Sequence, residues 1–152
     1  MSANIGVLEA QRIMRERQGD ADRLARQDRD DRILRTEPPV FFETMAACVG
    51  EYAKDFNGEI GVSGDDAMTF VSTTGLIELG KRRAPFLLRK VMLRQASNEV
   101  AIRTEKISRT YRRELSEEIW RFDVECGELT LNGRNLIECA EALFAGVADA
   151  FR

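Results

Sequence analysis

The side chains best suited by type and spacing to bind a ligand are basic residues concentrated in residues 81–113. This block holds 11 basic residues against only two acids, Glu99 and Glu105, so its formal charge is +9. Residues 1–80 hold 9 basic and 15 acidic side chains and residues 114–152 hold 3 and 9, so each flanking block carries −6. A basic block of this kind attracts phosphate on nucleic acid, anionic lipid headgroups or an acidic protein surface. Its members are Lys81, Arg82, Arg83, Arg89, Lys90, Arg94, Arg103, Lys106, Arg109, Arg112 and Arg113.

Two interpretations of the basic block remain open. The cations could pair across strands with acids of residues 114–125, forming a solvated ion-pair lattice of small net energy. Alternatively, the uncompensated cations form a patch for an anionic partner. The block has only two aromatic residues, Phe86 and Tyr111, so contacts to phosphate should dominate and binding should weaken steeply with salt. The binding residues that we predict for this patch are Arg103, Lys106, Arg109, Arg112 and Arg113.

The segment from Gly75 to Lys81 has the spacing G-x-x-x-x-G-K of a phosphate-binding loop. The match is incomplete, because Arg82 stands where the Mg²⁺-binding Ser or Thr belongs and Pro85 interrupts the helix that should follow. Such a loop also requires a parallel sheet, whereas this chain predicts antiparallel hairpins. We therefore expect no nucleotide-binding loop here.

The absence of histidine excludes several kinds of active site, among them Ser-His and Cys-His nucleophiles and H-E-x-x-H metal sites. The three cysteines, Cys48, Cys126 and Cys139, form no C-x-x-C pair, which speaks against zinc and dithiol chemistry. Asp65 and Asp66 lack the glutamate that completes a calcium loop, so we assign them to a turn. We expect no metal and no other cofactor, and we favour a non-enzymatic function.

The N-terminal third of the chain predicts helices. Residues 1–35 are rich in Arg and Asp with few apolar positions, which predicts a charged helical arm that can be mobile or can join copies in a homo-oligomer. From Phe41 to Phe56, apolar side chains recur every three or four residues, which indicates a core-facing helix with Cys48 as a buried thiol. We expect this helix to be capped by Thr36 and to end at Asn57-Gly58.

After residue 59 the apolar period changes to two, which predicts antiparallel strands. We expect a first hairpin between residues 59–62 and 68–73, around a turn at 63–66. Residues 85–95 also fit a helical face after Pro85, but we assign them to a strand. Further candidate strands are 76–79, 99–107, 110–115, 118–125 and 128–131, with a break at Ser116-Glu117.

The C-terminal residues predict an amphipathic helix. Asn135 with Glu138 three residues later has the pattern of a helix cap, and the apolar stripe from Leu136 to Phe151 should pack on the buried face of the sheet. The predicted fold is therefore α+β, with N-terminal helices, an antiparallel meander of about five to seven strands and a C-terminal helix on the sheet. Residues 36–152 form a single domain in this prediction.

The function that we expect is a non-enzymatic binding or interaction protein that uses its basic sheet surface. The alternative is a small-ligand carrier or small enzyme with a cavity between sheet and C-terminal helix, in which Tyr111, Arg113 and Glu125 supply polar lining. No apolar run approaches the length of a membrane span, and the first residues lack the pattern of a signal peptide. We therefore expect a cytoplasmic protein without a transmembrane segment.

Overall fold

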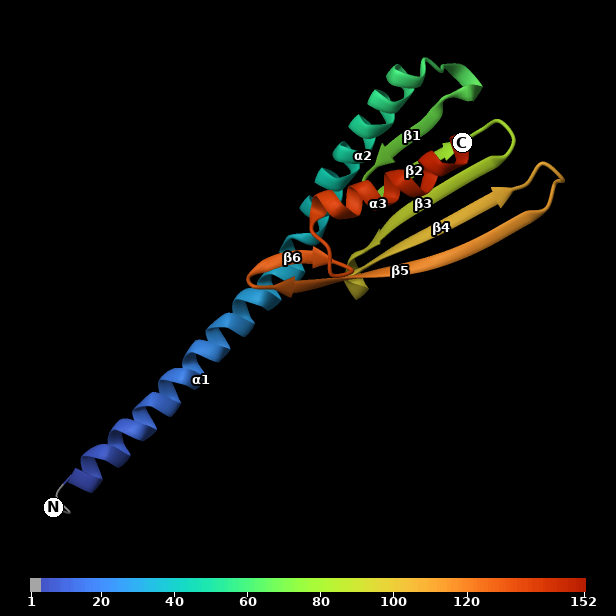
Figure 1. Ribbon diagram of the computed structural model, residues 1–152. Helices are drawn as coiled ribbons and strands as arrows, with labels where there is room; N and C mark the ends of the chain where they lie inside the picture. Colours follow the sequence, from blue (N-terminus) through green and yellow to red (C-terminus); the bar gives the residue numbers. More distant parts are fainter. Residues whose placement is uncertain (1–3) are drawn as a thin grey trace.

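The computed structural model describes residues 4–152, and it begins with two helices that form an almost continuous rod. Helix α1 spans Ile5–Thr36 and helix α2 spans Pro38–Ile60. Glu37 between them keeps a right-handed helical backbone, donating its N–H to the Ile33 carbonyl (2.9 Å) and accepting from the Phe41 N–H (3.0 Å). The two prolines after Glu37 lack an N–H, so the helical hydrogen bonding is interrupted only locally. Figure 1 shows α2 continuing roughly in the direction of α1.

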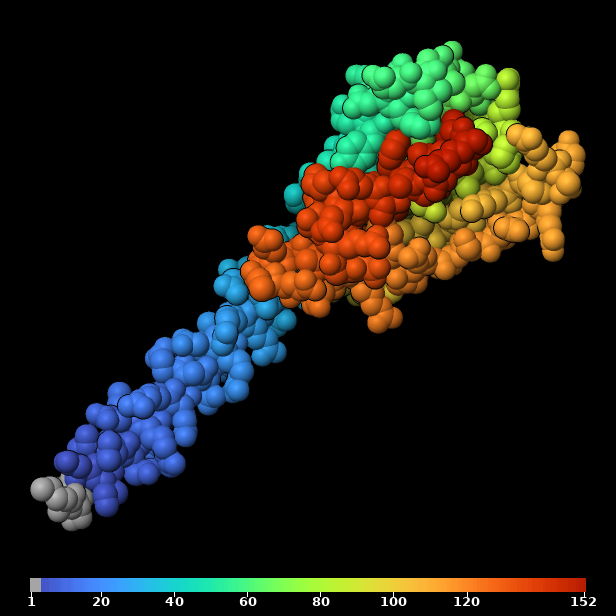
Figure 2. Space-filling model, in the orientation of Figure 1, coloured from blue at the N-terminus to red at the C-terminus, as the bar shows by residue number. Residues whose placement is uncertain are grey.

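Helix α1 stands clear of the rest of the molecule over most of its length (Figure 2). None of its 32 residues is buried. It meets the body only near its end, where Leu34 packs against the core. At the rise of an α-helix, about 1.5 Å per residue, α1 is roughly 48 Å long.

Six strands form one curled antiparallel sheet in which every strand pairs with its neighbours along the chain. This confirms the predicted fold class, including the C-terminal helix packed on the sheet. That helix, α3 (Leu136–Ala148), begins with the predicted cap: the Glu138 N–H donates to the Asn135 side chain (2.9 Å), and the Asn135 N–H donates to the Glu138 carboxylate (3.2 Å). The strands are β1 (Met68–Thr73), β2 (Leu76–Lys81), β3 (Phe86–Arg94), β4 (Glu99–Ile107), β5 (Arg113–Glu125) and β6 (Glu128–Leu131).

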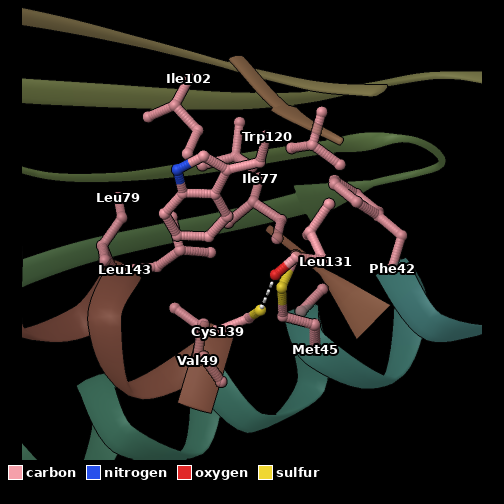
Figure 3. Packing of buried hydrophobic residues seen from close by; sticks show 14 of the residues in the cluster. Phe42, Met45, Val49, Ile77, Leu79, Ile102, Trp120, Leu131, Cys139 and Leu143 are labelled. Carbon is pink, nitrogen blue, oxygen red and sulfur yellow. Dashed lines mark hydrogen bonds between the residues drawn. The ribbon is translucent and has the colours of Figure 1, made fainter. Parts of the chain in front are cut away.

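The core lies between one face of the sheet, called the inner face here, and helices α2 and α3 (Figure 3). Because side chains alternate along a strand, only every second residue of β2 to β5 points into this layer. The Cys139 thiol of α3 sits at its centre and donates to the Leu131 carbonyl of β6 (3.3 Å). Buried contributors include Phe42, Met45, Val49, Ile77, Leu79, Val91, Val100, Ile102, Trp120 and Leu143.

The first predicted hairpin is wrong, because residues 59–62 do not form a strand. Helix α2 continues to Ile60 and ends at Gly61, whose φ of 73° is the left-handed conformation that favours glycine. Asn57 does not end the helix. Its side chain bonds the backbone of Met68 instead, accepting from the N–H (2.8 Å) and donating to the carbonyl (3.0 Å). The first hairpin therefore joins β1 to β2.

Three further expectations differ from the structure. The break at Ser116-Glu117 is wrong, because β4 pairs along the whole of this segment and holds β5 as one strand of 13 residues. Thr36 belongs to α1 and is not the cap of α2, and Cys48 is only partly buried. Residues 86–94 form a strand, as assigned.

Within residues 4–152, no helix combines the length and the apolar character that crossing a membrane requires.

Candidate binding site at one end of the sheet

Two loops of the basic block meet at one end of the sheet. The register pairs Lys81 of β2 with Leu87 of β3, and Phe86 of β3 with Ile107 of β4. In a meander, alternate turns lie at the same end, so the β2–β3 loop (82–85) comes beside the β4–β5 turn (108–112). We call this region the loop end. It is the sheet end furthest from α1 (Figure 1).

Five of the 11 basic residues of the block are paired with acids on other strands or loops. The contacts join Arg83 to Asp66 (2.8 Å), Lys90 to Glu78 (3.9 Å), Arg94 and Arg103 to Glu117 (3.4 Å each) and Arg113 to Glu105 (2.9 Å). These pairs are mostly solvent-exposed, so each contributes little to stability. Local pairing therefore accounts for about half of the basic block.

Two further cations of the block are engaged under α3. Lys81 donates to the Ala150 carbonyl (3.1 Å) and lies 5.3 Å from the centre of the Phe151 ring. Arg89 donates to the Leu143 carbonyl (3.4 Å) and to the Thr104 hydroxyl (3.3 Å). Burial lowers the pKa of the Arg89 guanidinium, and the nearby Glu118 carboxylate opposes that shift. Both side chains thus serve the packing of the C-terminal segment.

The remaining four cations, Arg82, Lys106, Arg109 and Arg112, are exposed, have no ion pair within residues 4–152 and lie at the loop end. They line two neighbouring recesses, which share Phe86, Ile107 and Ser108. The first recess, about 300 Å³, is lined by Arg82, Arg109 and both aromatic residues of the block, Phe86 and Tyr111. The second, about 320 Å³, lies between the sheet and the end of α3 and is lined by Lys106, Arg112, Glu114 and Asp149 among others. We call the set Arg82, Phe86, Lys106, Arg109, Tyr111 and Arg112 the loop-end site.

The β4–β5 turn is held by its own hydrogen bonds and presents an aromatic ring to solvent. The Ser108 backbone makes two hydrogen bonds across the turn: its N–H donates to the Arg112 carbonyl (3.0 Å), and its carbonyl accepts from the Tyr111 N–H (2.9 Å). The Arg112 N–H also donates to the Ser108 hydroxyl (3.1 Å). Tyr111 has a φ of 62°, which costs a non-glycine residue free energy, and its side chain is 89% exposed. The turn therefore holds the backbone of Tyr111 and exposes its ring, at a position in the chain between Arg109 and Arg112, which have no ion pair within residues 4–152.

Chemically, the loop end can neutralise several negative charges and offer a ring face for stacking. Exposed arginines bind phosphate and carboxylate groups through paired N–H donors. Glu114 and Asp149 line only the second recess, so the first recess presents cations and rings without an acid in its lining. The first recess is thus the part of the loop end that suits an anion best.

The structure brings together only some of the residues predicted for binding. Lys106, Arg109 and Arg112 lie at the loop end, whereas Arg103 and Arg113 are ion-paired on the outer face of the sheet. For the alternative cavity, Tyr111 and Arg113 lie near the start of β5 and Glu125 at its other end, roughly 40 Å away at about 3.3 Å per residue. These three residues therefore do not line one cavity.

Two members of the loop-end site, Arg82 and Phe86, were missed by the sequence reasoning. The predicted order of strands could have found them. In a meander every second turn lies at the same end of the sheet, so the loop between the second and third strands must lie beside the turn between the fourth and fifth. Residues 76–81 of the phosphate-loop pattern form strand β2, which runs antiparallel to β3 with no helix after it. The pattern is therefore not a phosphate-binding loop.

Within residues 4–152, neither the buried Cys139 nor a group of acids offers a competing site. Burial raises the pKa of the Cys139 thiol to about 11, so this thiol stays protonated and unreactive at neutral pH. In the part of the chain from residue 4 onward, no three Cys, Asp or Glu side chains are grouped closely enough to hold a metal ion. Comparison with protein-family models, with curated proteins and with solved structures found no significant match to this chain.

Proposed function

We propose that this chain is a non-enzymatic binding protein that engages an anionic polymer, in the first place single-stranded nucleic acid, through the loop-end site. The observation that carries the proposal is the convergence, in one recess, of Arg82 and Arg109 with both aromatic residues of the basic block. The local acids that neutralise Arg94, Arg103 and Arg113 have no counterpart in the lining of this recess.

A single strand fits the combination of charges and rings better than other anions do. Proteins that bind single strands without sequence preference combine cations for the backbone with aromatic rings on which bases stack. A duplex or a lipid surface offers phosphate but no unstacked base, so it would use the cations alone. Tyr111 is the group that distinguishes these partners, because its exposed ring lies between Arg109 and Arg112 in the chain.

The binding can be measured by fluorescence anisotropy with a labelled single-stranded oligonucleotide over a series of salt concentrations. If three or four phosphates are contacted, the logarithm of the binding constant should fall against log salt with a slope of about −2 to −3. A duplex of the same sequence and vesicles containing an anionic lipid serve as comparison partners. Absence of binding to the single strand at low salt would overturn the proposal.

Charge variants locate the binding surface. The triple variant Arg82→Gln, Arg109→Gln, Arg112→Gln should weaken binding about tenfold or more, since it removes three unpaired cations. The matched control, Arg94→Gln, Arg103→Gln, Arg113→Gln, changes the net charge equally but removes ion-paired cations. Equal losses in both variants would mean that only the overall charge matters.

Variants of the exposed ring separate stacking from charge. Tyr111→Ala should weaken single-strand binding about fivefold, because stacking of one base contributes on the order of 1 kcal/mol. Duplex binding should stay unchanged, and Tyr111→Phe should behave like the wild-type chain. An equal loss for single strand and duplex would remove the argument for nucleic acid and leave a general anion site.

A second candidate function is the binding of a small charged ligand in the recess between the sheet and α3. This recess, about 320 Å³, has a volume typical of small ligand pockets and brings Lys106 and Arg112 into one lining with Glu114 and Asp149. A ligand screen by thermal shift with Lys106→Met as control tests this possibility. Ligands that stabilise the wild-type chain and not the variant would favour the carrier function over the polymer-binding one.

A further inference from the structure

A second surface, away from the loop end, is an open groove between α2 and α3. Its volume is about 570 Å³, and its floor is formed by three aromatic side chains, Tyr52 and Phe56 of α2 and Phe144 of α3. The Phe144 ring lies 5.8 Å from that of Tyr52 and 5.7 Å from that of Phe56, each edge to face. Figure 2 shows α2 in green and α3 in red lying next to each other on this side of the molecule. The groove is thus an exposed apolar surface with fixed ring geometry.

The rim of this groove is acidic. Asp55 and Glu59 of α2 and Glu141 of α3 line it, all three exposed, and none has an ion pair within the described residues 4–152. No basic side chain belongs to the lining. A partner that fits this surface carries apolar side chains next to a cation, because the rings offer apolar contact and the carboxylates attract positive charge.

The α1 arm carries a stripe with this chemistry. Six residues at alternating spacings of three and four, which fall on one face of a helix, are Val7, Ala10, Met14, Arg17, Ala21 and Leu24. Five of the six are apolar, and the stripe is solvent-exposed throughout: Val7 is 56% exposed, Met14 67% and Leu24 59%. Arg17, the single cation of the stripe, has no ion pair among residues 4–152. Three large apolar side chains and one cation of this stripe thus have no partner within residues 4–152, although α1 also exposes Ile5, Leu8 and Ile13 outside the stripe.

We propose that the groove between α2 and α3 binds the α1 arm of a second copy of this chain, reciprocally, in a two-fold symmetric dimer. Because α1 and α2 form an almost continuous rod, the alignment of the two copies follows from the point at which the two-fold axis crosses the rod. If the two-fold axis passes between Thr36 and Glu37, where α1 meets α2, equal helical rise on both sides brings Arg17 of one copy level with Phe56, next to Asp55, of the other. Ala21 then lies level with Tyr52, so a small residue faces a ring.

The contact is small, as expected for a weak, reversible dimer. In this register only the part of the stripe from Met14 to Leu24 lies along α2, because Val7 and Ala10 fall level with residues beyond its end at Ile60. This part covers about 15 Å of helix, and a contact roughly 10 Å wide on both surfaces, made twice, buries on the order of 600 Å². The dimer should therefore form and dissociate with concentration.

Sedimentation velocity on the whole chain over a range of concentrations tests the dimer. The wild-type chain should show a monomer–dimer equilibrium. Met14→Asp with Leu24→Asp should shift it to monomer without loss of fold, because both side chains are exposed in the single chain. Asp55→Lys with Glu59→Lys should do the same from the groove side. The control Glu43→Lys with Glu51→Lys makes the same charge change on α2 outside the groove lining and should leave the equilibrium unchanged.

A charge exchange makes the test specific. Arg17→Glu alone should weaken the dimer, and Arg17→Glu combined with Asp55→Lys and Glu59→Lys should restore it at least tenfold relative to either change alone. A monomer at all concentrations would overturn the proposal. So would a dimer that responds to the stripe variants but not to the groove variants, because the arms would then pair with each other.

Discussion

The two halves of strand β5 are both hydrogen-bonded to neighbouring strands but lie in opposite environments. Arg113–Glu118 is exposed along its whole length, whereas in Ile119–Glu125 the side chains of Trp120 and Phe122 are buried. Strand β4 pairs with both halves up to Arg121, so hydrogen bonding does not distinguish them. The difference lies in what covers them: Trp120 and Phe122 pack in the core beneath α2 and α3, whereas residues 113–118 are exposed and only the end of α3 comes near them, across the second recess. Stability is therefore concentrated in the covered half, and the loop half can bind a partner without supporting the fold.

The largest effect should come from truncating the covered half of β5. Trp120→Ala should lower the free energy of unfolding by about 3–5 kcal/mol, because it empties a buried site and removes the indole N–H donation to Glu118 (2.8 Å). Leu115→Ala in the loop half should change it by less than about 0.5 kcal/mol, since Leu115 is 67% exposed. Urea denaturation measures both. Similar losses in the two variants would mean that both halves of β5 contribute equally to the stability of the fold.

The next effect depends on pH and again concerns the covered half. Burial raises the pKa of Cys139 from its ordinary value of 9.0 to about 11. Between these values the unfolded chain releases the thiol proton and the folded chain keeps it, so stability is complete below pH 9 and falls as the pH rises towards 11. Two pKa units correspond to about 3 kcal/mol, which is the largest loss attributable to this thiol.

The matching control for this pH effect is Cys139→Ala, in which only the other titrating groups contribute to the alkaline loss. The difference between the two stability curves above pH 9 isolates the thiol. Thiol labelling gives an independent check: exposed Cys126 should react in the folded protein, and buried Cys139 should react only on unfolding. Rapid labelling of Cys139 in the folded chain would contradict the burial on which the pH effect rests.

A smaller effect should come from the cap that starts the covering helix. Asn135→Ala removes the acceptor for the Glu138 N–H and should lower the free energy of unfolding by about 1 kcal/mol. Asn135→Asp keeps an acceptor at this position and should stay near the wild-type value. The thermal unfolding midpoint is a sufficient measurement. Equal behaviour of the two variants would show that α3 is held by its packing alone.

The smallest effect should be a gain of stability at the loop end. Tyr111→Gly relieves the left-handed backbone at φ 62° and loses few contacts, so it should raise the free energy of unfolding by about 0.5 kcal/mol. Tyr111→Ala keeps the strained backbone and should leave stability unchanged. Both should weaken binding to a single strand about fivefold, because both remove the ring. A stabilised Tyr111→Gly that binds as tightly as the wild-type chain would separate the strained turn from the proposed function.

Sequence patterns predicted the elements whose formation is decided locally. Strands 99–107 and 128–131 have the predicted bounds, because alternation and the flanking turns suffice to define them. The α3 cap follows from two side chains three residues apart. The polar pair Ser116-Glu117 is different: it looks like a turn, but the long partner β4 holds it extended. Likewise α2 passes Asn57 because that side chain bonds Met68, 11 residues away.

The candidate site was predictable only in part, for the same reason. Lys106, Arg109 and Arg112 stand out as cations in a basic block, but so do Arg103 and Arg113. The acids that pair with these two lie opposite on neighbouring strands, and the pairing depends on register, which composition does not contain. Contact between Phe86 and the β4–β5 turn depends on register in the same way.

The order of strands in the sheet has a consequence for how the chain acquires its fold. Because each strand pairs with the one made just before it, the hairpins can close through short loops, which favours rapid formation of the sheet. The two covering helices come from opposite ends of that sheet: α2 precedes β1 and α3 follows β6. A nascent chain thus carries a sheet with a half-open apolar face until its final helix is synthesised. Residues 136–148 therefore supply the second helical cover of this face, and the apolar side chains of the sheet stay partly open until they dock.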